Sequence, residues 1–106
     1  MLSNLKSQMR KGLLEYCILS IIHQSEAYAS DILDTLKEAQ LLVVEGTVYP
    51  LLTRMKNEGL LSYRWQESTG GPPRKYYTLT EEGKQLLAQL DEEWHAICQA
   101  INKITK

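Results

Sequence analysis

The chain has 106 residues, of which 43% are hydrophobic and 24% are charged, and its formal net charge at pH 7 is −1. This length is enough for one domain with a single core, but not for a buried catalytic cleft as well. No apolar run is long enough to span a bilayer, and residues 1–6 carry no apolar signal segment, so the sequence excludes a membrane protein and predicts a cytoplasmic location.

The first predicted element is an amphipathic helix over about residues 11–24. Its apolar residues recur at three- and four-residue spacing, at Leu13, Leu14, Cys17, Ile18, Ile21 and Ile22. Tyr16 and Leu19 widen the apolar surface beyond one stripe. We therefore expect this helix to pack on two sides, one of which meets a partner subunit.

A second, short helix is predicted to follow a turn at residues 25–28. Ser30 and Asp31 suit its cap and first turn, where hydrogen-bond acceptors and negative charge are favoured. The helix is expected to end near residues 39–40. The apolar run at 41–44 is too short to assign by periodicity, and is either a short strand or a connection packed inward.

A third helix, over about residues 46–58, is predicted to be the recognition helix of a helix-turn-helix, and we call it the reading helix. Its apolar residues occupy positions i, i+3, i+4 and i+7, at Val48, Leu51, Leu52 and Met55. Gly59 suits the left-handed position just past a helix end. The side chains away from the apolar stripe are of types that hydrogen-bond phosphates or base edges, namely Thr47, Tyr49, Thr53 and Arg54.

A β-hairpin is predicted over about residues 60–79. Apolar and polar residues alternate on both arms, and residues 67–73 between them are dense in turn formers. The returning arm carries Arg74 and Lys75. A hairpin directly after a reading helix is typical of the wing of a winged helix-turn-helix, whose basic arm reaches a DNA backbone or minor groove.

The aromatic residues of this hairpin are predicted to be mainly structural. Tyr76 and Tyr77 point to opposite faces of a strand, so at least one is expected in the core. Trp65 is expected to lie under the wing as a structural aromatic.

The last element is a long helix over about residues 80–106, capped by Thr80. Its inward positions follow steps of 4, 3, 4, 3, 4 and 3, at Gly83, Leu87, Leu90, Trp94, Ile97, Ile101 and Ile104. A heptad seam this long points to a second copy of the helix. We therefore expect a homodimer held by Leu87, Leu90, Trp94, Ile97, Ile101 and Ile104.

These elements predict a mainly α fold with a small β-hairpin (α+β), in which residues 1–79 form a DNA-binding winged helix-turn-helix and residues 80–106 dimerise. The charge distribution agrees with a nucleic-acid partner. Residues 46–77 hold five basic side chains against two acidic ones, a local balance of +3, whereas residues 26–45 hold five acids against Lys37.

Two motifs closely resemble the PadR family of bacterial transcriptional regulators. They are Gly46-Thr47-Val48-Tyr49-Pro50-Leu51-Leu52 followed by Gly59-Leu60, and Gly71-Pro72-Pro73-Arg74-Lys75-Tyr76-Tyr77-Thr78-Leu79-Thr80-Glu81-Glu82-Gly83. The resemblance runs from about Lys11 to Ile101. It implies a dimeric winged-helix repressor of the compact subfamily, whose central helix enters the major groove and whose single C-terminal helix dimerises.

The resemblance also implies roles for individual residues. Tyr28 and Ser30 resemble positions that contact the DNA backbone. The family often has an arginine where this chain has Pro72, which leaves Arg74 and Lys75 as the contacts of the wing. The full set of expected DNA-binding residues is Thr47, Tyr49, Thr53, Arg54, Arg74, Lys75, Tyr28 and Ser30.

Trp94 is the candidate effector residue. On the heptad seam it would lie near its symmetry mate, where two indoles either pack together or hold a planar aromatic ligand. The resemblance implies an aromatic or hydrophobic effector between the subunits, with Leu90, Ile97 and Tyr16 helping to line the site. Such an effector would release the repressor from a pseudo-palindromic operator.

Two alternatives to this function stay open. The same fold could serve as a protein-interaction module, or as a thiol- or metal-sensing repressor using Cys17 and Cys98, which otherwise read as small buried side chains. His23 and His95 lack an acidic partner at ligand spacing, so no metal or other cofactor is predicted. With no nucleophile elbow, phosphate loop or spaced carboxylate pair, the sequence does not predict an enzyme.

Overall fold

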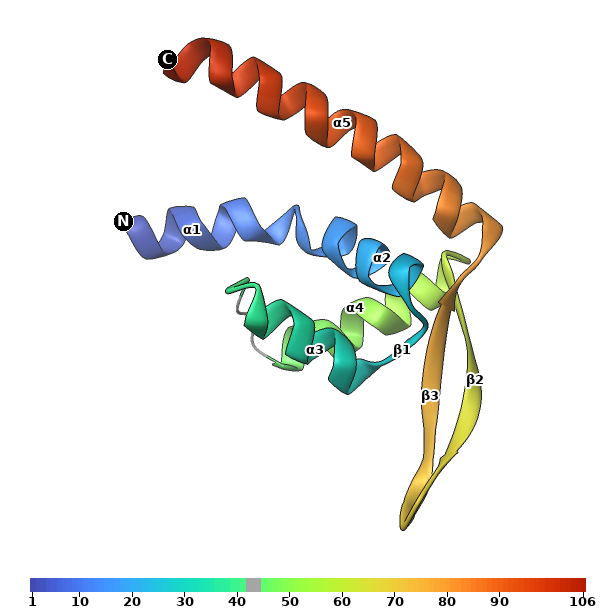
Figure 1. Ribbon diagram of the computed structural model, residues 1–106. Helices are drawn as coiled ribbons and strands as arrows, with labels where there is room; N and C mark the ends of the chain where they lie inside the picture. Colours follow the sequence, from blue (N-terminus) through green and yellow to red (C-terminus); the bar gives the residue numbers. More distant parts are fainter. Residues whose placement is uncertain (42–44) are drawn as a thin grey trace.

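The computed structural model describes residues 1–41 and 45–106, which form helices around a small antiparallel sheet (Figure 1). The elements in chain order are α1 (Leu2–Lys11), α2 (Leu14–Gln24), β1 (Ala27–Tyr28), α3 (Ala29–Glu38), α4 (Glu45–Asn57), β2 (Leu61–Ser68), β3 (Gly71–Leu79) and α5 (Glu81–Thr105). The sheet has three strands in the order β1-β3-β2. The predicted class, mainly helical with a small β component, is confirmed.

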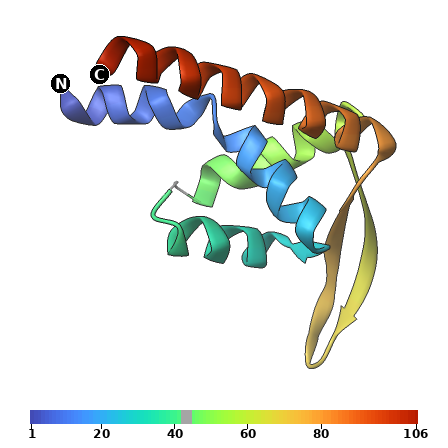
Figure 2. The same cartoon turned by 45° about the horizontal axis from the view of Figure 1, so that its top comes forward.

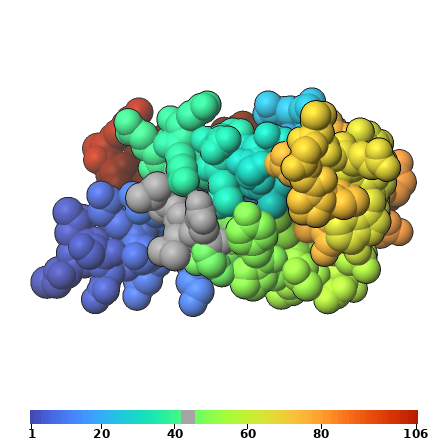
Figure 3. Space-filling model, turned by 90° about the horizontal axis from the view of Figure 1, so that it is seen from below, coloured from blue at the N-terminus to red at the C-terminus, as the bar shows by residue number. Residues whose placement is uncertain are grey.

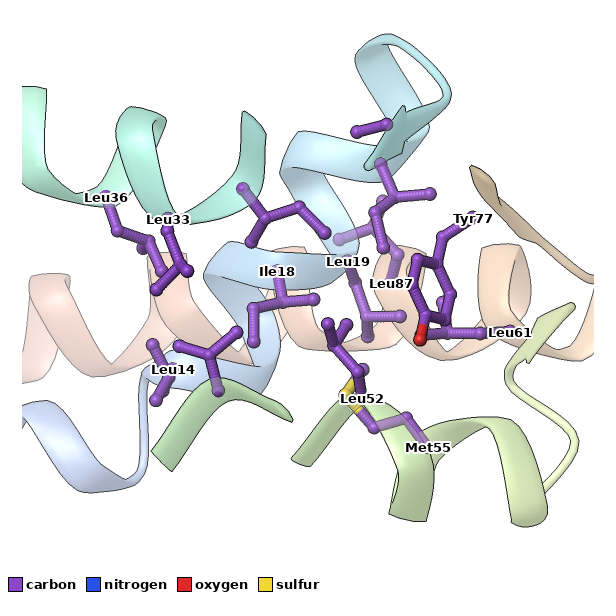
Figure 4. Close-up of a cluster of buried hydrophobic side chains, with 14 residues drawn as sticks. Leu14, Ile18, Leu19, Leu33, Leu36, Leu52, Met55, Leu61, Tyr77 and Leu87 are labelled. Atoms are coloured by element: carbon purple, nitrogen blue, oxygen red, sulfur yellow. The ribbon is translucent and has the colours of Figure 1, made fainter. Parts of the chain in front are cut away.

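The core lies where α2, α3 and α4 meet the sheet and the start of α5 (Figure 4). The apolar stripe of α4 faces it, because Val48, Leu52 and Met55 are fully buried and Leu51 is half-buried. Burying one such side chain stabilises the fold by about 1.5–3 kcal/mol. Gly59 ends the turn after α4 with a φ of +82°, as its position in the sequence predicts.

The N-terminal helix α1 was not predicted from the sequence. The helical conformation is interrupted at Gly12 and Leu13, between α1 and α2. The first core helix therefore begins at Leu14 rather than near residue 11. Leu2, Leu5 and Met9 of α1 are all exposed. Leu2, Leu5 and Met9 do follow the three- and four-residue spacing of a helix, so the sequence carried a signal for α1, although these side chains face solvent in this chain rather than the core.

The short strand β1 replaces the turn predicted at residues 25–28. Ala27 pairs with Tyr77 of β3, and Tyr28 pairs with Tyr76. A two-residue strand is too short to show alternation in a sequence. Tyr28 is also the N-cap residue of α3, and its backbone N–H donates to the Asp31 carboxylate at 3.0 Å, so the cap lies two residues before the predicted Ser30.

The wing, formed by β2 and β3, is longer than predicted. The strands reach Ser68 and Gly71, and the turn between them is shorter than the expected 67–73. Pro72 and Pro73 therefore lie in β3. They fit there because β1 pairs with β3 only as far as Tyr76, which leaves the outer part of β3 with an open edge that needs no N–H donor.

The long helix α5 is capped by Thr80, whose side-chain oxygen accepts a hydrogen bond from the Gly83 N–H at 3.0 Å. Gly83 and Leu87 are buried, and the helix then leaves the core. Helices α1 and α5 both project away from the wing, and the two chain ends lie on that side (Figures 1 and 2). Of the apolar run 41–44, residues 42–44 lie outside the described part of the chain.

Candidate nucleic-acid interface

The outer face of α4 is set by burial of its apolar stripe. With Val48, Leu52 and Met55 in the core, Tyr49 and Thr53 point to one flank of the helix and stay exposed. The Thr53 hydroxyl donates to the Tyr49 carbonyl at 3.2 Å. This flank faces the start of α3 and the wing.

A groove of about 370 Å³, open to solvent, runs between these three elements. Its lining is aromatic, hydroxyl-bearing and basic, and consists of Tyr28, Ala29, Ser30, Tyr49, Thr53, Trp65, Pro73, Arg74, Lys75 and Tyr77. Figure 3 looks onto this face, where α3 in teal, α4 in green and the wing in yellow and orange meet. We call it the wing groove.

Most of the expected DNA-binding residues converge on the wing groove. They are Tyr28, Ser30, Tyr49, Thr53, Arg74 and Lys75. Thr47 is exposed on α4 but does not line the groove. Arg54 lies on the other flank of α4, where its guanidinium pairs with the carboxylates of Glu15 and Glu58, the latter at 3.4 Å.

The two groove cations are held by neutral groups. The Arg74 guanidinium carbon lies 3.9 Å from the centroid of the Tyr28 ring, and its Nη2 donates to the Ser30 hydroxyl. Lys75 Nζ lies 4.7 Å from the Tyr63 ring and 5.7 Å from the Trp65 ring. Aromatic faces and hydroxyls orient a cation without cancelling its charge, so both side chains keep their positive charge for an anion.

Trp65 is a groove residue that the sequence did not predict. Its side chain is 61% exposed, whereas the sequence placed it as a structural aromatic under the wing. It shares a strand face with Tyr63, and the rings meet edge to face at 5.8 Å. The prediction was wrong because Trp65 pairs with Lys75 on the part of the hairpin that extends past the core. The predicted arm ended before residue 67, so the sequence offered no signal of how far the strand extends past the core.

The two adjacent tyrosines of β3 divide as alternation predicts. Tyr77 is buried. This burial is the main reason that the pKa of Tyr77 is raised, and the nearby Tyr63 and Tyr49 raise it further. Tyr76 points to the opposite face of the sheet from Tyr77 and is half-buried. Its ring centroid lies 4.9 Å from that of Tyr28. One aromatic therefore fills the core and the other supports the sheet surface beside α3.

The residues proposed for an effector lie on the other side of the molecule, between α2 and α5. The Tyr16 and Trp94 rings are 6.4 Å apart. The Tyr16 hydroxyl donates to the Asp91 carboxylate, and this hydrogen bond, aided by burial, raises the pKa of Tyr16 to about 12. Leu90 and Trp94 are half-buried, whereas Ile97 is exposed.

Leu87 and the two cysteines also lie on α2 and α5. Leu87 is buried in this chain's own core, so it is not available to a partner helix as the heptad seam suggested. Cys17 and Cys98 are both free thiols and half-buried. Burial raises the pKa of Cys17, which disfavours the thiolate that a redox sensor needs.

The sequence from residue 18 to residue 89 matches the transcriptional regulator PadR-like family. This match covers more than half of the chain. The chain belongs to the PadR-like family. Its members are transcriptional regulators, so this PadR-like protein is a regulator rather than an enzyme.

Solved structures agree with this assignment. A PadR-like transcription factor from Bacteroides fragilis is 60% identical, with 96% of this chain and 99% of that chain covered and a TM-score of 0.81. A PadR-like regulator from Bacillus cereus is 39% identical, with 94% and 98% covered and a TM-score of 0.83. The fold of this PadR-like chain is therefore a winged helix-turn-helix.

A third structure is that of Bacillus subtilis PadR in complex with operator DNA. It is 31% identical to this chain, covers 74% of it at a TM-score of 0.69, and is a longer protein, of which 46% is covered.

Two further properties of the PadR-like chain concern residues 1–41 and 45–106 only. In these ranges no group of three histidine, cysteine or acidic side chains is arranged to hold a metal ion. None of the helices in them combines the length and apolar character needed to cross a membrane.

Proposed function

We propose that this PadR-like protein is a cytoplasmic repressor that binds a pseudo-palindromic operator as a homodimer and is released by a hydrophobic or aromatic effector. Its reading helix α4 would enter the major groove of DNA, and its wing would contact the adjacent backbone. The operator complex of Bacillus subtilis PadR supports DNA as the partner.

The observation that carries this proposal is the composition of the wing groove. Tyr49 and Thr53 of α4 lie there beside Arg74 and Lys75 of the wing. The first pair offers hydroxyls for base edges or phosphates, and the second offers charge that no neighbouring ring neutralises. Bringing both kinds of contact to one open surface is what a DNA-reading domain requires.

Exposed apolar stripes on α1 and α5 support the homodimer. On α5, Ile97 and Ile101 are each 49% exposed and Ile104 is 82% exposed. On α1, Leu2, Leu5 and Met9 are exposed at three- and four-residue spacing. Apolar helix faces that project from a domain are covered in stable proteins, and a second copy supplies matching faces.

The contact between Tyr16 and Trp94 supports an aromatic effector near α5. A planar ligand against Trp94 would change how α5 sits on α2 and so alter the distance between two reading helices of a dimer, provided that it binds the two arrangements unequally. Titration with 1-anilinonaphthalene-8-sulfonate tests the site. We expect Trp94→Ala to weaken binding of this probe about tenfold, while Trp65→Ala leaves it unchanged. Equal affinities of the Trp94 variant and the wild type would remove Trp94 from the effector site.

The DNA proposal is tested by fluorescence anisotropy with the DNA upstream of the protein's own coding sequence and with an unrelated duplex of equal length. We expect tight, sequence-selective binding that weakens as salt rises, because phosphate contacts release counterions. Weak binding that is equal for both duplexes would favour the rival function, a winged-helix module for protein contacts.

A further inference from the structure

The three arginines near the reading helix differ in what holds their guanidinium groups. Arg54 pairs with Glu15 and Glu58. Arg64 pairs with Glu26 at 3.3 Å. Arg74 instead rests on the Tyr28 ring and donates to Ser30, both of which are neutral. The charge of Arg74 is therefore the least compensated of the three, although all three residues are exposed.

The geometry at Arg74 favours binding of a phosphate. A guanidinium carries five N–H donors in one plane, and an aromatic ring below that plane leaves the edge donors accessible. One donor of Arg74 is used by the Ser30 hydroxyl. Within residues 1–41 and 45–106 no other acceptor takes a hydrogen bond from the Arg74 side chain, so its remaining donors can form the paired hydrogen bonds with which arginine recognises phosphate oxygens.

The Tyr28 ring is itself held by the backbone and by a second aromatic. Tyr28 pairs with Tyr76 across the sheet, and their rings meet edge to face at 4.9 Å. The Tyr28 N–H donates to the Asp31 carboxylate at the start of α3. The Arg64 guanidinium carbon lies 4.8 Å from the centroid of the Tyr76 ring. Because these contacts link all three strands to α3, the ring is a rigid platform at the base of the wing.

We propose that Tyr28 is a positioning residue, which holds the Arg74 guanidinium at the edge of the wing groove where it binds a phosphate of the DNA backbone. Tyr28 then acts through Arg74 and makes no independent contribution to DNA affinity. This inference rests on the proposed function, since it assigns a role within the DNA-binding surface.

The proposal predicts a specific pattern of variants. Arg74→Ala removes the phosphate contact, so we expect about a tenfold loss of affinity and a salt slope smaller by about one per subunit. Tyr28→Leu keeps an apolar side chain but removes the π face, and should lose about as much as Arg74→Ala. Tyr28→Phe keeps the ring and should retain most of the affinity. Arg74→Lys keeps the charge without the planar fork, and should fall between Arg74→Ala and the wild type.

The deciding measurement is a double-mutant cycle by fluorescence anisotropy over a series of salt concentrations. The probes are the protein's own upstream DNA and an unrelated duplex, because a phosphate contact acts on both. If Tyr28 acts through Arg74, the Tyr28→Leu/Arg74→Ala double variant binds as Arg74→Ala does. Additive losses, equal weakness of Tyr28→Phe and Tyr28→Leu, or an unchanged salt slope in Arg74→Ala would each overturn the proposal.

Two controls separate this test from folding and from the wider function. Circular dichroism melts identify any variant that fails to fold. If Tyr28→Leu does not fold, the affinities of Arg74→Lys and Tyr28→Phe still test the proposal. Lys84→Ala removes one positive charge from an exposed position near the start of α5 that does not line the wing groove, and should leave affinity unchanged. Failure of the wild type to bind either duplex would reject the DNA function, whereas normal wild-type binding with additive variants rejects only the role of Tyr28.

Discussion

At the scale of single residues, spacing identifies the helix face on which a side chain lies, but its partners determine what it can do. Arg54 and Arg74 were equally plausible DNA contacts in the sequence. In the structure, two carboxylates surround Arg54, whereas a tyrosine ring and a hydroxyl hold Arg74. Glu58 lies four residues after Arg54 and is a local signal, but Glu15, Tyr28 and Ser30 are distant from their arginines in the chain, so spacing alone could not reveal these contacts.

Gly83 is a second residue whose role depends on a distant neighbour. A Cβ at Gly83 would lie 2.2 Å from the carbonyl oxygen of Leu60, at the base of the wing. The same carbonyl accepts hydrogen bonds from the Thr80 N–H at 3.2 Å and the Thr80 hydroxyl at 3.0 Å. The start of α5 therefore packs directly on the wing, and only glycine allows this approach.

We expect Gly83→Ala to lower the free energy of unfolding by about 2 kcal/mol or more, because the backbone must shift to relieve the clash. Gly12→Ala is the matched control, since its φ of −77° is helical and nothing lies within 4 Å of the added methyl. That variant should be neutral or more stable by up to about 1 kcal/mol. Urea unfolding measures both, and equal stabilities would contradict the close packing.

At the scale of elements, α5 has two different halves. Its first half belongs to the core through Gly83 and Leu87, and it contacts α2 through the Tyr16 hydroxyl and Asp91. Its second half carries Ile97, Ile101 and Ile104 into solvent. One unbroken heptad pattern thus serves an intramolecular contact first and an apolar surface afterwards.

The contact of α2 with α5 predicts a pH dependence. The pKa of Tyr16 rises from 10.0 to about 12 in the folded state, so the folded protein holds this proton more tightly than the unfolded chain. The stabilisation is therefore complete below pH 10 and is lost as the pH rises to about 12. We expect Tyr16→Phe to cost about 1 kcal/mol below that window and little above it.

Urea unfolding at pH values below and above this window measures the difference. Tyr49→Phe, which removes the hydroxyl of a 49% exposed ring, is the control and should match the wild type at both pH values. If the difference in free energy of unfolding between Tyr16→Phe and the wild type stayed constant across this pH range, the hydrogen bond to Asp91 would not be the source of that difference.

The exposed half of α5 predicts the effect of charge at the dimer contact. Ile101→Glu places a carboxylate in the middle of the apolar stripe, where pairing with a second copy would bury it. We expect a shift from dimer to monomer by analytical ultracentrifugation, with at least a tenfold weaker association, since about 1.4 kcal/mol corresponds to tenfold. Gln99→Glu adds the same charge on the opposite face of α5 and should remain dimeric.

At the scale of the whole molecule, the proposed reading surface and the exposed apolar helices lie at different ends. The wing and α4 form one face, while α1 and the second half of α5 project to the other side (Figures 1 and 2). A dimer made through these helices would carry two reading faces at a fixed separation. Operator half-sites are then expected about one helical turn, or about 10 base pairs, apart.

This geometry predicts how operator spacing affects affinity. Inserting about five base pairs between the half-sites turns one of them to the opposite side of the duplex, so only one can be bound at a time. We expect affinity to fall to that of a single half-site in anisotropy titrations. The Ile101→Glu variant should be insensitive to the insertion, and a wild type equally insensitive would contradict binding as a rigid dimer.

The sequence by itself determined the order and type of the main elements, because their signals are local. The 3.6-residue stripe of α4, the alternation of the hairpin and the cap at Thr80 each depend on residues close together in the chain. The family motifs are local as well. Tertiary structure alone decided what required contacts between distant segments. Strand β1 exists because β3 pairs with it, and Trp65 is exposed because the hairpin extends past the core. The Glu15 carboxylate beside Arg54 and the Tyr28 ring beside Arg74 come from other elements, so no spacing within one element records these contacts.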